Sequence, residues 1–252
     1  MLDLLKEWGT GIVAVLALVQ PWILATWRRY FRPGRIEIYE TGTIEIGYSA
    51  FGPTIGLHGT LRACDRDLFI RSVHLELFKE KDQSRHRFEW GVFRSSKVIA
   101  GRPEELTLEL PAGFMLLISQ PHRFNIQFHE LSRQDEIRKV LEPVQQGWFT
   151  ALSKALPIQT HQACYQTFSQ GKAHVTAFTE LDRLCYWEAG KYQLTMTVST
   201  EPRNRKFLRT WSFVFSQEDI NSIRLNPIVI LREMCGQDNV RYNFVYARYQ
   251  ES

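Results

Sequence analysis

The chain has 252 residues, of which 44% are hydrophobic and 23% charged, and 31 Lys and Arg against 27 Asp and Glu give a formal net charge of +4. The first 35 residues hold five of the basic and two of the acidic residues, so the rest keeps 26 and 25 and is nearly neutral. A nucleic-acid-binding body concentrates basic residues on one face, so we expect no nucleic-acid partner. Four cysteines without paired spacing argue against a disulfide framework and a zinc site.

Near the N-terminus, residues 8–27 form a window of twenty residues without a charge. Twenty helical residues rise about 30 Å, which is roughly the thickness of a bilayer's hydrocarbon core. Tryptophans lie near both ends of the window and arginines follow it, as is typical of residues at a membrane interface. We assign this role to Trp8, Trp22, Trp27, Arg28, Arg29, Arg32 and Arg35. The sequence therefore predicts a single-pass transmembrane anchor over residues 1–32.

Two other interpretations of this window are a cleaved signal peptide and a buried helix. A signal peptide has a basic start and small residues at its end, and a buried helix of a globular core keeps a polar stripe; the window has neither feature. One lysine, Lys6, precedes the window, whereas four arginines follow it. Because basic residues stay inside, we expect the N-terminus outside and the body cytoplasmic, at the cell membrane or, in a bacterium, the inner membrane. Anionic lipid headgroups would attract the arginines.

Small residues recur along one face of the predicted helix at spacings of four, three, four and four. They are Thr10, Ala14, Ala17, Pro21 and Ala25. Such a face lets another helix approach closely, so it indicates self-association. A chance distribution of small residues explains the pattern equally well.

Alternating apolar and polar residues predict strands after Gly34. Ile36, Ile38, Ile44 and Ile46 alternate around Thr41-Gly42, which we interpret as the turn of a hairpin. Further alternating stretches cover residues 57–61, 69–78, 88–93, 106–110 and 124–128. Because side chains at period two point to opposite faces of a sheet, one face of each strand is expected to be buried.

The apolar period changes to three and four from residue 132 to 156, which predicts a helix interrupted near Pro143 and Gly147. We expect a mostly helical insertion at about residues 131–188. Strands return at residues 192–198 and 208–215, and Ser216 resembles the cap of a C-terminal helix that begins at Glu218. Residues 240–246 alternate again and are expected to close the domain as an edge strand.

One short motif adds a family resemblance. Residues 188–194, Glu-Ala-Gly-Lys-Tyr-Gln-Leu, resemble the acidic-x-Gly-x-Tyr-x-Cys signature of strand F in immunoglobulin domains. Leu194 replaces the cysteine. The resemblance implies a structural corner in which Gly190 makes the turn and the Tyr192 hydroxyl bonds to the backbone upstream. The predicted fold is thus mainly β: the transmembrane helix, then one immunoglobulin-like or arrestin-like β-sandwich over residues 36–252 with the helical insertion and the C-terminal helix.

Motifs that carry chemistry are missing from the sequence. It contains no Gly-rich phosphate loop, no His-Glu-x-x-His and no Gly-x-Ser-x-Gly, so we expect no cofactor and no metal. The one constellation to weigh is Cys164 with His161 and His174, since an imidazole can activate a thiol. A buried structural cysteine is the alternative, and we favour it.

Our leading hypothesis is a non-enzymatic, membrane-anchored cytoplasmic sandwich that binds another protein, as an adaptor or a subunit of a membrane-associated assembly. Two alternatives stay open: a membrane-tethered enzyme with its site in the helical insertion, and an oligomerising effector that perturbs the membrane. The expected partners are an anionic lipid bilayer and either a second protein or a second copy of this chain. The sequence names no substrate, partner or pathway.

Overall fold

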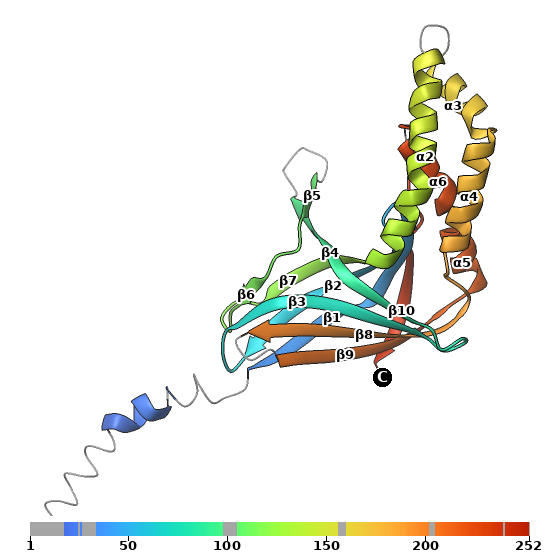
Figure 1. The fold of residues 1–252 in the computed structure, drawn as a ribbon. Helices are drawn as coiled ribbons and strands as arrows, with labels where there is room; N and C mark the ends of the chain where they lie inside the picture. Colours follow the sequence, from blue (N-terminus) through green and yellow to red (C-terminus); the bar gives the residue numbers. More distant parts are fainter. Residues whose placement is uncertain are drawn as a thin grey trace, which may run out of the picture.

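The computed structural model describes residues 18–24, 26, 34–97, 105–155, 160–201, 205–238 and 240–251 (Figure 1). The strands are β1 (Arg35–Ser49), β2 (Gly52–Cys64), β3 (Leu68–Lys79), β4 (Arg85–Lys97), β5 (Glu105–Glu109), β6 (Phe114–Leu116), β7 (His122–His129), β8 (Gly190–Glu201), β9 (Arg205–Phe215) and β10 (Val245–Glu251). The helices are α2 (Leu131–Ala155), α3 (His161–Ser169), α4 (Lys172–Leu184), α5 (Gln217–Ile223) and α6 (Asn226–Met234).

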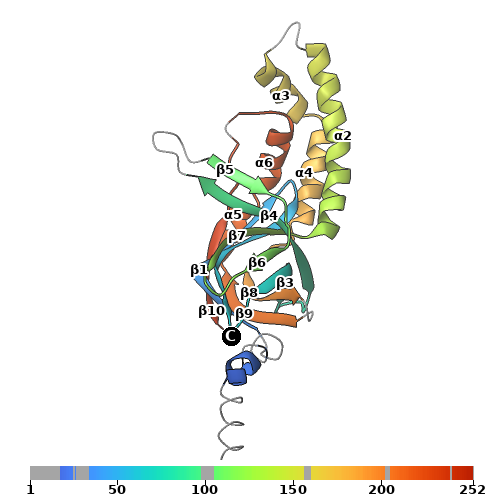
Figure 2. The same ribbon diagram turned by 90° about the vertical axis from the view of Figure 1, so that its left-hand side faces the viewer.

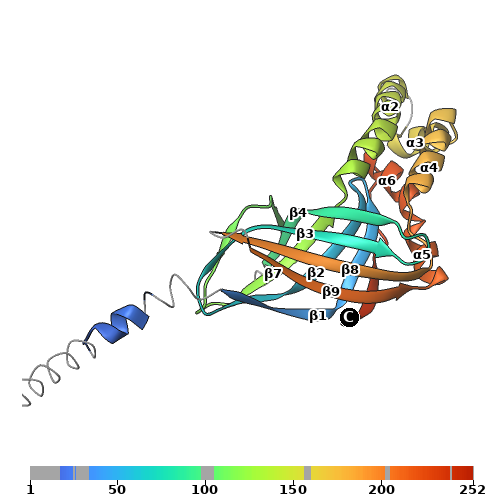
Figure 3. The same ribbon diagram turned by 60° about the horizontal axis from the view of Figure 1, so that its bottom comes forward.

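The strands form one antiparallel sheet that closes on itself. Their order is β5-β4-β7-β2-β1-β10-β9-β8-β3-β6, and β3 also pairs with β4. Residues 74–78 of β3 bond to residues 85–89 of β4, which joins the eight strands from β4 to β3 into a closed barrel (Figure 3). The prediction of a two-sheet sandwich is therefore wrong. The alternating pattern was read correctly, but alternation buries one face in a barrel as well as in a sandwich, and only the long-range pairing distinguishes them.

The main core fills the inside of the barrel. An eight-stranded barrel is just wide enough for side chains to fill it. The inward residues of β8 and β9 that the alternation predicts are all buried: Tyr192, Leu194, Met196, Val198, Trp211, Phe213 and Phe215. On the opposite wall Ile44, Ile46 and Ile55 are also fully buried.

Thr41-Gly42 does not form the predicted hairpin turn. β1 continues through it from Arg35 to Ser49, and the pairing with β2 shifts between Glu40 and Ile44. Gly42 has φ of +86°, a conformation that glycine adopts without strain and that accommodates such a bulge. The chain instead turns at Ala50 and Phe51, where Gly52 also has a positive φ of +93°.

The last strand is not at an edge. β10 pairs with β1 on one side and with β9 on the other, so it is an interior strand of the barrel. It also starts later than predicted, at Val245.

The helices gather at one end of the barrel, which we call the helical end (Figure 1). The predicted helical insertion corresponds to α2, α3 and α4. α2 runs 25 residues straight through Pro143, so the predicted interruption is wrong. Proline removes one backbone hydrogen bond, but Ile137 and Val144 are buried on either side of it, and this packing holds both halves of the helix.

The predicted cap of the C-terminal helix is confirmed. Ser216 Oγ accepts a hydrogen bond from the Asp219 backbone N–H at 3.1 Å, and Asp219 Oδ2 accepts one from the Ser216 backbone N–H at 2.9 Å. This reciprocal pair is a capping box, and α5 follows it at once.

The transmembrane prediction requires correction. Among the residues that the structure describes, no helix combines the length and the apolar character that crossing a bilayer needs. Within the window 8–27, residues 18–24 and 26 are helical, and the other positions lie outside the described residues.

Candidate functional site

The barrel wall is interrupted between β3 and β4. Beyond their paired residues the two strands separate: residues 68–70 of β3 pair with β6, whereas residues 93–97 of β4 pair with β5. The chain from β5 to β6 crosses the opening. We call this opening, bounded by β4, β6 and β7, the seam.

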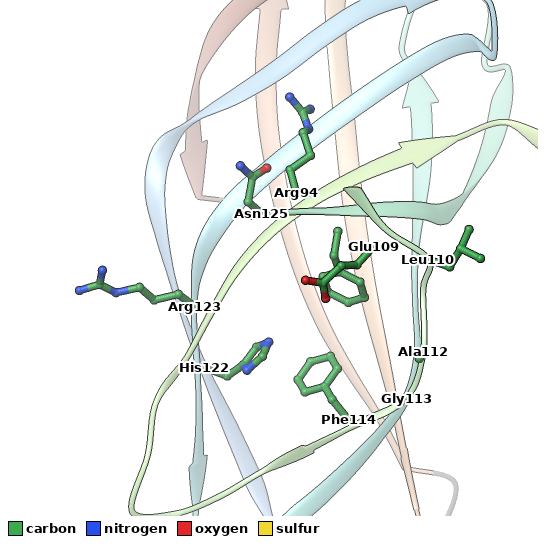
Figure 4. Close-up of a pocket in the computed structure, with 10 residues that line it drawn as sticks. Arg94, Glu109, Leu110, Ala112, Gly113, Phe114, His122, Arg123 and Asn125 are labelled. Carbon is green, nitrogen blue, oxygen red and sulfur yellow. The ribbon is translucent and has the colours of Figure 1, made fainter. Parts of the chain in front are cut away.

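A pocket of about 290 Å³ lies in the seam (Figure 4). Its lining comes from β4, from the segment between β5 and β6, and from the start of β7. The lining residues are Phe93, Arg94, Glu109, Leu110, Ala112, Gly113, Phe114, His122, Arg123 and Asn125. Side chains far apart in the sequence thus meet here because of the strand order.

Aromatic rings form the inner wall of the pocket. The rings of Phe114 and His122 stack with centroids 4.2 Å apart, and Phe93 meets Phe114 edge-on at 5.9 Å. Figure 4 shows Phe114 and His122 pointing toward one another from opposite sides of the opening. Burial lowers the pKa of His122, so its imidazole is neutral at neutral pH and adds to the apolar character of the wall.

A buried ion pair fixes the polar side of the pocket. Arg94 Nη2 donates to Glu45 Oε1 at 2.7 Å, and His58 Nε2 lies 3.5 Å from Glu45 Oε2. Glu45 is only 4% exposed. Burial alone would raise the pKa of Glu45, but the hydrogen bonds of His58 and Arg94 outweigh it and the pKa is lowered. Because Glu45 neutralises Arg94, this guanidinium is poorly suited to recruit an anionic ligand.

Two polar atoms at the pocket have no hydrogen-bond partner among the described residues. They are Arg94 Nε and Asn125 Oδ1, both of which are buried. In Figure 4 the Asn125 amide oxygen points toward Arg94, while the Arg123 guanidinium points away from the pocket. The polar part of the pocket thus contains one unsatisfied donor and one unsatisfied acceptor.

The seam is close to the end of the barrel opposite the helices, which we call the bare end (Figure 2). β1, β3, β7 and β9 start there and β2, β6 and β8 end there. Met115, Leu117 and Ile118, in β6 and the turn after it, are exposed at this end. A Cβ at Gly34 would lie 2.6 Å from a side-chain carbon of Leu68, so Gly34 lies at the same end, directly before β1.

Basic residues exceed acidic residues in the chain segments at and next to the bare end. The described residues 34–37, 62–67, 117–123, 201, 205 and 206 contain six Lys and Arg and four Asp and Glu. The adjoining residues 28–33 and 202–204, which lie outside the described residues, add four arginines in sequence. These segments together hold ten basic and four acidic residues, whereas the rest of the chain holds 21 and 23.

A second hollow of about 440 Å³ lies between α2, α6 and the turn after β1. Leu141, Ile230 and Met234 give it apolar walls, and Arg138, Glu142 and Glu233 are also in its lining. Because these charges are of both signs, the hollow favours no class of charged ligand.

The predicted catalytic candidates lie in the helices, and among the described residues no hydrogen bond joins the Cys164 thiol to His161 or His174. Cys164 is buried against Trp148 and Cys235, in a small core cluster of the helices. His161 Nδ1 lies 3.1 Å from Gln237 Nε2 instead of bonding a thiol. His174 is buried near the rings of Tyr165 and Phe168, at 5.9 and 6.1 Å, and burial lowers its pKa. Within the described residues, no group of three or more His, Cys, Asp or Glu could hold a metal ion.

The predicted corner residues make a local contact inside the barrel. The Tyr192 hydroxyl donates to the Glu188 carbonyl at 2.8 Å, and Gly190 before it has φ of +149°. The local geometry is that expected from the motif, but the surrounding fold is the barrel and not an immunoglobulin sandwich.

Most of the predicted interface and helix-packing residues lie outside the described residues: Trp8, Trp27, Arg28, Arg29, Arg32, Thr10, Ala14, Ala17 and Ala25. Trp22 and Pro21 are exposed on the helical residues 18–24, and Arg35 starts β1 with its guanidinium 2.9 Å from Glu37.

Sequence reasoning missed the seam. Phe93, Phe114 and His122 belong to three different strands, and each fits an ordinary alternating pattern. The one available signal is the turn-like sequence Pro111-Ala112-Gly113, which links β5 to β6 across the opening.

Comparison of the chain with protein-family models, with curated proteins and with solved structures finds no match. Its function has to be argued from its own residues.

Proposed function

We propose that this protein is a non-catalytic binding protein that docks on an anionic membrane surface through the bare end of its barrel. The observation that carries the proposal is the coincidence of exposed apolar side chains at this end with a net positive charge in the chain segments at and next to it. The proposal concerns attachment to the surface and involves no membrane-spanning helix.

The apolar part of this end supports insertion among lipid headgroups. Met115, Leu117 and Ile118 lie within four consecutive residues and are all exposed, whereas Leu116 between them is buried. Fully burying one such side chain contributes about 1.5 to 3 kcal/mol relative to leaving it in water. Side chains that the fold already half covers contribute less, on the order of 1 kcal/mol each.

The basic part supplies attraction to anionic lipids. Each Lys or Arg near such a surface contributes about 1 kcal/mol, and the attraction falls off within a Debye length. In sequence, the segments at and next to the bare end have ten basic against four acidic residues, so this attraction is comparable in strength to the apolar contribution. Either alone gives weak, reversible attachment, and stable attachment needs two such signals.

The N-terminal segment favours the same orientation. Leu18, Trp22 and Ile23 are exposed on its described helix. Seven residues, 27–33, join that helix to Gly34, so it lies within about 30 Å of the bare end. With this end on the membrane, the helical end faces away from it and is free to contact a protein partner.

A local fluorescence measurement on the full chain tests the proposal. We introduce Ile118→Cys together with Cys64→Ser, attach an environment-sensitive dye, and add vesicles with or without phosphatidylglycerol. The dye emission should shift to the blue with the anionic vesicles, and high salt should reduce the shift because it screens the arginines.

The matched control carries the dye at Val214→Cys in the same Cys64→Ser background. Val214 is 60% exposed on β9, where it pairs with Lys191 near the helical end. No shift is expected there. An absent shift at position 118, or an equal shift at position 214, would rule out docking through the bare end.

A further inference from the structure

The two sides of the seam are strand edges without a partner. β7 pairs with β2 along its whole length but with β4 only through residues 126–129, so residues 122–125 have one neighbour. β6 pairs with β3 alone. In the described part of the chain, the backbone bond from Gln120 N–H to the Leu117 carbonyl, at 3.3 Å, closes the turn between them, and none joins the edges above it.

Unpaired edges present hydrogen-bonding groups to whatever enters the seam. In an antiparallel strand, residues alternate between bonding one neighbour and pointing N–H and C=O to the other side. Two of residues 122–125 therefore direct their backbone groups into the opening. A barrel normally removes such edges, and an edge left open is a template for another strand.

The pocket between the edges has the size and character for one bulky apolar side chain. Its 290 Å³ is just below the roughly 300–1,000 Å³ of small-molecule sites. Phe93 and Phe114 supply its aromatic wall, and Leu110, 86% exposed, lies at its rim.

We infer that the seam docks an extended segment of a partner protein, which adds a strand to the open edges and places one bulky apolar side chain in the pocket. The inference rests on the proposed function, because such a segment would be presented at the membrane surface. Acidic residues of the bound segment, on either side of its bulky apolar side chain, would complement the charge of Arg123. The Arg123 side chain points out of the pocket (Figure 4).

A lipid acyl chain is the competing occupant, and the edges disfavour it. Main-chain N–H and C=O groups that lose water need hydrogen-bond partners, and a hydrocarbon has none. A peptide backbone supplies donors and acceptors at the spacing of a strand.

The test uses blocked seven-residue peptides with alternating threonines, an aspartate at each end and a central Phe, Leu or Trp. Each is added to the full-length protein without lipid. At least one should bind, and the amides of residues 114–116 and 122–125 should exchange with solvent more slowly. Replacing the central residue by Gly should weaken binding at least tenfold, and so should methylating alternate backbone nitrogens, which removes the donors of one edge.

Matched variants locate the site. Leu110→Asp should weaken binding at least tenfold, because it places a charge at the mouth of the pocket. Leu208→Asp, which changes a similarly exposed residue on β9, should leave binding unchanged. Both side chains are on the surface, so both variants are expected to fold.

Three results would overturn the inference: no peptide binding up to roughly 1 mM, equal binding of the backbone-methylated peptide, or the same amide protection by anionic vesicles alone, which would assign the seam to lipid. The dye measurement at position 118 uses no peptide, so it tests membrane docking independently of peptide binding in the seam.

Discussion

The hydroxyl of Tyr192 makes two hydrogen bonds with one main-chain residue. It donates to the Glu188 carbonyl at 2.8 Å and accepts from the Glu188 N–H at 3.1 Å, while its ring stacks on Phe213 at 5.5 Å. Tyr192→Phe keeps the ring and removes both bonds. We expect the free energy of unfolding to fall by about 1 to 3 kcal/mol, since the partly buried Glu188 carbonyl loses its hydrogen-bond donor. Chemical denaturation measures it.

The control for this substitution is Tyr246→Phe. Tyr246 is 62% exposed on β10, so its hydroxyl can bond to water in either state. The change should be within about 0.5 kcal/mol. If both substitutions lower the free energy of unfolding by the same small amount, the Tyr192 hydroxyl does not stabilise the turn between Glu188 and Tyr192.

Gly56 leaves room for the ion pair beside the seam. A Cβ at this position would lie 2.9 Å from Arg94 Nη2 and 3.1 Å from the Glu45 Cβ. Gly56→Ala should therefore displace the Arg94 guanidinium from a buried carboxylate and lower stability by about 2 kcal/mol. In a background with Glu45→Gln and Arg94→Gln the same change should lower stability much less. If Gly56→Ala lowers stability equally in the double-substituted background, its effect does not come from displacing Arg94.

His129 makes stability depend on pH. Burial, with a smaller contribution from Arg94, lowers its pKa from 6.5 to about 4. Above pH 6.5 the imidazole is neutral in both states; as pH falls below 6.5 the unfolded chain binds the proton first, so stability is lost down to about pH 4. The loss is about 3 kcal/mol in total. His129→Phe should flatten the slope of unfolding free energy between pH 6.5 and 4, and an unchanged slope would contradict the assignment.

At the residue scale, the sequence was informative where a contact is local. Ser216 with Asp219, and Tyr192 with Glu188, lie three and four residues apart, and short motifs encode both. Arg94 reaches Glu45 across 49 positions, and nothing near either residue in the sequence indicates the other. Distant ion pairs of this kind depend on the strand order.

At the scale of elements, α2 holds a weak point that a substitution can remove. Gly147 lies inside the helix, where glycine lowers stability by roughly 0.5 to 1 kcal/mol relative to alanine. A Cβ there would meet the Phe168 ring at 3.5 Å, an ordinary contact. Gly147→Ala should therefore raise the melting temperature. A lower melting temperature would mean that α2 and α3 pack more tightly here than their distance indicates.

Helices and strands were predicted well where the spacing of apolar residues stays constant. They were predicted poorly where a glycine was the evidence for a turn. The helix cap at Ser216 and the buried faces of β8 and β9 follow directly from sequence. Gly42 has the same local signature in a turn and in a bulge, because both need a positive φ. The pairing of β1 with β10 on its other side decides between them, and that pairing is long-range.

At the scale of the whole molecule, the pairing of β3 with β4 distinguishes the observed barrel from the predicted sandwich. Five pairs between β3 and β4, at residues 74–78 and 85–89, close the ring. The seam exists because that ladder stops and the chain from β5 to β6 fills only part of the opening. Composition and periodicity contain no information on where a ladder stops, so the pocket could not be predicted.

The described residues contain two hydrophobic clusters, which predicts two levels of stability. The larger one joins the barrel to the near part of the helices through residues such as Ile137, Leu181 and Ile230, whereas Trp148, Cys164 and Cys235 form a separate cluster in the outer part. Regions with few buried contacts to the main core open at lower free energy. Backbone amides of α3 should therefore exchange faster than those of β8.

Substitutions in the two clusters should act differently on exchange. Trp148→Ala removes the largest side chain of the outer cluster, so it should speed exchange of α3 amides while leaving β8 nearly unchanged. Leu181→Ala, in the main cluster, should destabilise α3 and β8 together because it lowers the free energy of global unfolding by about 2 to 5 kcal/mol. Hydrogen exchange followed by mass spectrometry measures both regions in one experiment. If Trp148→Ala speeds exchange in β8 as much as in α3, the outer helices and the barrel unfold as one unit, and the helical end is a rigid extension of the barrel rather than a separately opening part.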